Sequence, residues 1–102
     1  RRWGYYVVPV VVGDRFVARF DGRVEDRRLR LDGWWWEVAE GERVAFGEAL
    51  EAGLARFLAY LGVEGVALPR GLGRTARAVW RGGVARVPEW RPAAPSPAAV
   101  PA

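Results

Sequence analysis

Residues 5–20 read YYVVPVVVGDRFVARF and contain the strongest strand signals in the chain. The run that ends at Val12 is apolar on both faces, which is typical of a strand that is buried on both sides or lies at an interface. The pair Gly13-Asp14 is a turn signal, and the residues after it alternate between two faces. The stretch predicts an antiparallel hairpin, in which Pro9 marks an edge or a bulge because proline has no N–H to donate.

Alternation assigns the residues of each later strand to the two faces of a sheet. In the second strand we expect one face to carry Phe16, Ala18 and Phe20, and the other to carry Arg15, Val17 and Arg19. Asp21-Gly22 is a further turn signal, followed by a charged connection. Residues 28–36 predict a third strand with Leu29 and Leu31 facing inward and at least one indole of Trp34, Trp35 and Trp36 on the outer face.

The segment from Phe46 to Leu61 has the periodicity of an amphipathic helix. Gly62 is a natural stop for this helix. The apolar stripe of the helix consists of Leu50, Leu54, Phe57, Leu58 and Leu61. Further along, the pattern predicts a short strand within residues 63–68, a short helix from Thr75 to Arg81 that ends at Gly82-Gly83, and a last strand at residues 84–87.

Together these elements predict an α+β fold: an antiparallel β-hairpin that extends into a three-stranded sheet, followed by an amphipathic helix and a further short strand. We expect one small α+β domain over residues 1–87. Residues 88–102 are rich in Pro and Ala, which predicts a disordered C-terminal tail. The sequence begins at Arg1 and not at Met, so we expect a piece of a longer protein.

The 102 residues include no Cys, His, Lys or Gln, which excludes most active-site chemistry. The chain has no thiolate nucleophile, no imidazole base or zinc ligand, and no amine for a Schiff base. We therefore expect no catalytic residue, no metal and no cofactor. No apolar run approaches the ~20 residues of a membrane span, and no signal peptide is visible, so we expect a cytoplasmic protein without a membrane partner.

The net charge of +4 is unevenly distributed. Residues 1–36 carry eight Arg against five acids, residues 37–64 carry two Arg against six acids, and residues 65–102 carry six Arg against one acid. A basic surface attracts polyanions through phosphate contacts and counterion release. The alternative is that these charges only keep the domain soluble.

Two groups of arginines are candidates for contact with the phosphates of duplex DNA. On the strands, alternation places Arg15 and Arg19 on the same face of the sheet, and likewise Arg28 and Arg30, where they could contact phosphates. The alternative is that these arginines belong to a solvated outer face without a binding role. On the short helix, three arginines form a stripe beside Trp80, which stacks on a base or lies in the core. The complete set of DNA-binding candidates is Gly13, Asp14, Arg15, Arg19, Arg23, Arg28, Arg30, Arg74, Arg77 and Arg81.

One part of the chain resembles a known bacterial family. The segment WGYYVVPV at residues 3–10, followed by GDR at 13–15, VAR at 17–19 and Asp21, is similar to the C-terminal region of the winged-helix DNA-binding-domain family. This family includes the DNA glycosylases that repair interstrand crosslinks. Arg23 stands where a Lys is usual, and Trp35-Trp36-Glu37 resembles a later element of the family pattern.

The resemblance implies a parent protein with upstream winged-helix domains that is a DNA glycosylase. The catalytic motif of the family begins with a Gln in the N-terminal part, and this chain has no Gln, so it supplies no catalytic residue. A β-hairpin in the C-terminal region of the family contacts DNA, and the hairpin at Gly13-Asp14 is the candidate here.

Two classes of function follow. The first is a DNA-binding and scaffolding C-terminal module of a glycosylase-like DNA repair protein, non-catalytic on its own. The second is a stand-alone protein–protein interaction domain that uses the apolar strand 5–12 and the tryptophans at 34–36, since exposed aromatic clusters mark interaction sites. A small independent enzyme fits the composition poorly.

Overall fold

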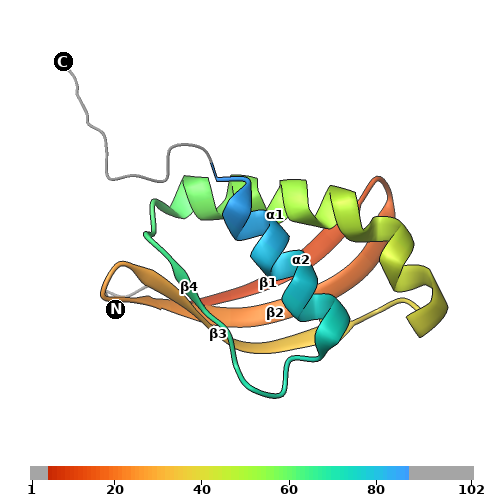
Figure 1. Ribbon diagram of the computed structural model, residues 1–102, viewed down its shortest axis with the longest axis horizontal. Helices are drawn as coiled ribbons and strands as arrows, with labels where there is room; N and C mark the ends of the chain where they lie inside the picture. Colours follow the sequence, from red (N-terminus) through yellow and green to blue (C-terminus); the bar gives the residue numbers. More distant parts are fainter. Residues whose placement is uncertain (1–4, 88–102) are drawn as a thin grey trace, which may run out of the picture.

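Four strands form one mixed sheet in the computed structural model, which describes residues 5–87 (Figure 1). The strands β1 (Tyr5–Val12), β2 (Arg15–Glu25) and β3 (Arg28–Trp36) make an antiparallel meander. The short strand β4 (Val66–Ala67) pairs in parallel with β3, so the sheet order is β1-β2-β3-β4. The predicted α+β fold is confirmed, whereas the predicted tail at 88–102 lies outside the described residues.

Two α-helices cover one face of this sheet (Figure 1). The 3₁₀-helix η1 (Glu40–Phe46) leads directly into α1 (Gly47–Leu61), which ends at Gly62 in the left-handed conformation that favours glycine. After β4 the chain forms α2 (Arg74–Ala85), which packs beside α1. None of the helices within residues 5–87 is long and apolar enough to cross a membrane.

The core lies between the sheet and the helices and is dominated by aromatic rings. Phe20 of β2 is buried between Trp80 of α2, with ring centroids 5.1 Å apart, and Phe57 of α1, at 5.7 Å. Trp34 stacks on Phe20 at 5.9 Å. The predicted helical stripe supplies the buried residues Leu50, Leu54 and Leu58, with Phe57 and Leu61 packed at its margin. Burial of these side chains holds the two layers together.

A bulge in β2 changes the predicted sides of its first residues. The register passes from Val10 opposite Ala18 to Val11 opposite Phe16, so Val17 is an extra residue. Val17 and Ala18 are both fully buried, and Phe16 is exposed. The prediction that Phe16 shares a face with Ala18 and Phe20, and Val17 the opposite face, was therefore wrong, because strict alternation has no place for an extra residue.

A second bulge, in β3, arranges the three tryptophans. The register passes from Asp21 opposite Gly33 to Gly22 opposite Leu31, which leaves Asp32 as the extra residue. Leu29 and Leu31 face inward as predicted, and after the bulge Trp34 and Trp36 also face inward, with rings 5.2 Å apart. Trp35 alone lies on the outer face, which confirms that at least one indole points outward.

Three predicted boundaries were wrong. The residues Asp21-Gly22 lie within β2, and the turn is formed by Asp26-Arg27, which both have positive φ. The helix α2 continues through Gly82-Gly83 to Ala85, and residues 84–87 form no strand. The glycine pair lies within the helix at its contact with α1 and does not end it: a Cβ on Gly83 would lie 3.1 Å from the Leu54 Cβ, and one on Gly82 would displace the Glu51 carboxylate.

Candidate functional site

The face of the sheet opposite the helices, here called the outer face, carries exposed apolar side chains. On β1 the residues facing outward are Tyr5, Val7, Pro9 and Val11, and the residues between them pack on the core. Val11 of β1 lies opposite Phe16 of β2. Pro9 of β1 lies opposite Arg19 of β2, which in turn lies opposite Trp35 of β3, so side chains from all three strands share this surface. We call this surface the outer apolar patch; it consists of Tyr5, Val7, Pro9, Val11, Phe16 and Trp35.

The large side chains of the outer apolar patch are substantially exposed. The exposed fractions run from 41% for Trp35 to 61% for Val7. None of the helices in the described part lies on this face (Figure 1). The sheet is thus apolar on its inner face, apart from Arg15 at one end, and on its outer face at the β1 side, which agrees with the apolar character predicted for both faces of strand 5–12.

Trp35 is held in a fixed position on the outer face. Its ring lies across Gly33, where any Cβ would overlap it. The Arg19 guanidinium lies over the indole ring, 4.5 Å from the ring centroid, and pairs with the Glu37 carboxylate at 3.5 Å. The patch therefore has an aromatic side chain that lies on a glycine and has an arginine over its ring.

The other half of the outer face is a network of opposite charges. Arg23 contacts Asp32 at 3.2 Å and Glu25 at 3.9 Å, and Arg30 contacts the same two carboxylates at 3.8 Å and 3.4 Å. Arg28 is exposed, and within residues 5–87 it has no carboxylate in ion-pair distance. Exposed pairs of this kind contribute little stability, but they cancel most of the local positive field.

Arg15 and Arg19 do not share a face. Because of the bulge at Val17, Arg15 lies opposite Val12 on the helix side, where it pairs with Glu42 at 3.3 Å and sits over the Phe46 ring. Arg19 lies on the outer face against Trp35. The predicted comb of strand arginines is therefore divided between two faces, while Gly13 and Asp14 form the exposed hairpin turn beside it.

The predicted stripe on α2 is also divided. The Arg77 guanidinium donates hydrogen bonds to the carbonyl oxygens of Pro69, at 2.6 Å, and Arg70, at 3.3 Å, so it fixes the loop before the helix. Arg74 and Arg81 are exposed and, in the described part of the chain, pair with no carboxylate. Trp80 is fully buried, which leaves it in the core and not available to stack on a base.

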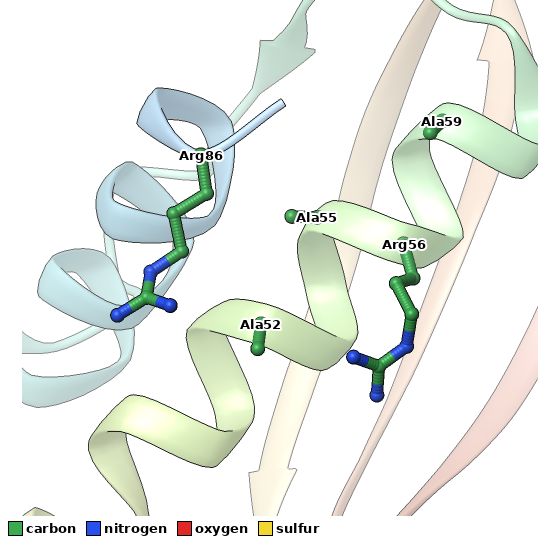
Figure 2. A pocket seen from close by; sticks show the side chains of 5 residues that line it. All are labelled: Ala52, Ala55, Arg56, Ala59 and Arg86. Carbon is green, nitrogen blue, oxygen red and sulfur yellow. The ribbon is translucent and has the colours of Figure 1, made fainter. Parts of the chain in front are cut away.

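A groove between the helices was not anticipated from the sequence. It has a volume of about 470 Å³ and is lined by Ala52, Ala55, Arg56, Ala59 and Arg86 (Figure 2). Arg86 is held at the groove by ion pairs to Glu51 at 3.2 Å and Glu48 at 3.7 Å. The small residues at 52, 55 and 59 were the only signal of this groove in the sequence.

Within residues 5–87, no three carboxylates gather in a way that holds a metal ion. The most distinctive surface is therefore the outer apolar patch. Comparison of the chain with protein-family models, with curated proteins and with solved structures finds no match, so the resemblance to the winged-helix family stays a prediction.

Proposed function

We propose that the chain is a protein–protein interaction module that binds its partner through the outer apolar patch. The observation that supports this proposal is the position of Val7, Val11, Phe16 and Trp35 on a sheet face that bears no helix within the described residues. Exposed apolar side chains gathered on one surface mark interaction sites, because their transfer out of water is favourable on binding.

The chemistry of the outer apolar patch suits a binding surface. Trp and Arg are among the residues that most often dominate binding energy, and Trp35 of β3 forms such a pair with Arg19 of β2. Because Gly33 and Arg19 hold the indole in place, little side-chain freedom is lost on binding. The ion pairs of Arg23 and Arg30 supply the polar rim of the patch.

Site-specific photo-crosslinking tests this proposal. A photoreactive phenylalanine analogue is introduced at Val11 in the full chain in cells, and matched proteins carry it at Val44 or Tyr60, which are 78% and 83% exposed away from the sheet face. We expect a discrete protein adduct from position 11 that disappears when Phe16→Asp is added. Adducts of equal yield from all three positions, or none from position 11, would contradict the proposal.

DNA binding is the second candidate, and the arginines without carboxylate partners support it. Arg74 and Arg81 lie on α2, and Arg70 lies in the loop before it. None of the three pairs with an acid among residues 5–87, whereas Arg15, Arg19, Arg23 and Arg30 are all paired. In this proposal α2 contacts the phosphates of duplex DNA, and the chain serves as the DNA-binding and scaffolding part of a glycosylase-like repair protein in the cytoplasm.

The salt dependence of DNA binding tests this second candidate. We expect weak, sequence-independent binding of the full chain, and Arg74→Ala with Arg81→Ala should reduce the log–log salt slope by roughly 0.9 for each phosphate that is no longer bound. The matched control is Arg15→Ala with Arg19→Ala, which removes two arginines that already have carboxylate partners. Equal salt slopes for the two double variants would contradict the proposal that α2 contacts the phosphates.

A further inference from the structure

We propose that the partner of the outer apolar patch is a second copy of this chain, and that two sheets pack face to face about a twofold axis. This inference rests on the proposed interaction function and names the partner. A twofold axis that lies in the interface and passes through the patch places Val11, Phe16 and Trp35 of one copy against the same surface of the other. Such a contact has the geometry of a β-sandwich, with two sheets about 10 Å apart.

The charges of the outer face favour a copy of the same chain. Each strand arginine on this face that borders the patch already has a carboxylate beside it: Arg19 has Glu37, and Arg23 has Asp32. Opposite signs alternate in the network, so two copies do not repel each other strongly when they meet. A strongly acidic or strongly basic partner would find no complementary field on this face.

The dimensions of the face agree with a weak dimer. Three strands of 8 to 11 residues, at about 3.3 Å per residue and about 4.8 Å between strands, span roughly 30 Å by 14 Å. This is roughly 420 Å² per copy, or about 840 Å² for both copies, which is below the ~1,200 Å² of stable specific interfaces and in the range of weak, transient contacts. We therefore expect a dissociation constant of about micromolar size.

Self-association through the edge of β1 is disfavoured. In the described part of the chain, β1 is an edge strand whose other side has no paired strand. Pro9, at its middle, lacks the N–H that a further strand would need for a continuous ladder. The side chains of the outer face, and not the backbone of β1, are therefore the groups that meet in the dimer.

Sedimentation equilibrium of the full 102-residue chain tests this inference. We expect a monomer–dimer equilibrium, and Phe16→Asp should raise the dissociation constant more than about 100-fold, because symmetry places two carboxylates in the apolar contact. The matched control Val44→Asp, at an exposed site on η1, should leave the constant unchanged. Val11→Arg serves as a second variant, and urea unfolding of each variant checks that it still folds.

Three results would overturn the dimer. The first is a chain that remains monomeric at about 500 µM, well above a micromolar constant. The second is equal weakening by Phe16→Asp and Val44→Asp. The third is slowed amide exchange along the open side of β1, which indicates edge pairing. If the chain is monomeric while the position 11 adduct contains a different protein, the dimer fails and the interaction function stands.

Discussion

At the residue scale, Gly33 determines how the outer face is presented. The Trp35 ring lies across this glycine, and Arg19 stacks on the ring from β2. Any larger residue at 33 would occupy the space of the indole. Because Gly33 has no side chain, the Trp35 ring can lie flat on the sheet and remain partly exposed.

Gly33→Ala should displace the Trp35 ring and break its contact with Arg19. We expect a loss of about 1–2 kcal/mol in the free energy of unfolding, typical of a forced steric rearrangement. Urea unfolding measures the loss, and a change in the near-ultraviolet circular dichroism reports the new position of the indole. Gly41→Ala is the control, because a Cβ at Gly41 meets nothing within 4 Å; a similar loss at both positions would show that the Trp35 contact is not responsible.

At the element scale, α1 packs against both the sheet and the second helix, α2. Its buried stripe faces the sheet, and its other side receives α2 at Gly82 and Gly83. Glu51 belongs to this second contact, since its carboxylate pairs with Arg86 across the helices. One 15-residue helix therefore carries core packing and helix–helix packing on adjacent faces.

Leu54→Ala should be strongly destabilising, because Leu54 is buried in the core and its Cβ also faces Gly83 of α2. We expect a loss of about 2–5 kcal/mol, the usual range for a buried leucine. Tyr60→Ala, at an exposed position on the same helix, should cost less than about 0.5 kcal/mol. Urea midpoints of the two variants and the parent check this, and similar midpoints for all three would mean that the stripe is not part of the core.

At the scale of the whole molecule, the two layers leave the sheet with two different apolar faces. Along β1, Val8 and Val10 pack on the core, whereas Val7 and Val11 point away from the helices. The inner pair stabilises the fold, and the outer pair is free to act in binding. Neighbouring valines of one strand thus have different roles.

Exchange of valine for threonine separates these roles, because the shape is kept while a hydroxyl is added. Val8→Thr with Val10→Thr should cost about 1–3 kcal/mol, since each hydroxyl is then partly buried against the apolar core. Val7→Thr with Val11→Thr should change the free energy of unfolding by less than about 0.5 kcal/mol. Urea unfolding at low protein concentration makes the comparison without a contribution from self-association. Equal losses in both double variants would show that the two faces are not different.

The hairpin, the third strand and the helical stripe could be predicted from the sequence because their signals are local. The alternation from Leu29 to Leu31 has the two-residue period of a strand, and the spacing from Leu50 to Leu58 has the 3.6-residue period of a helix. Both periods can be recognised within a short stretch of sequence. The α+β class follows from the order of these elements.

The composition of the candidate surface depended on contacts between distant parts of the chain. The bulge at Val17 turned Phe16 outward and Arg15 toward the helices, and its register is set by pairing with β1. In this position Arg15 donates a hydrogen bond to Glu42, which is 27 residues away in sequence. No local period encodes such a bulge or pairing, because both arise only when the strands and helices pack together and each side chain takes the partner that the tertiary structure brings within reach.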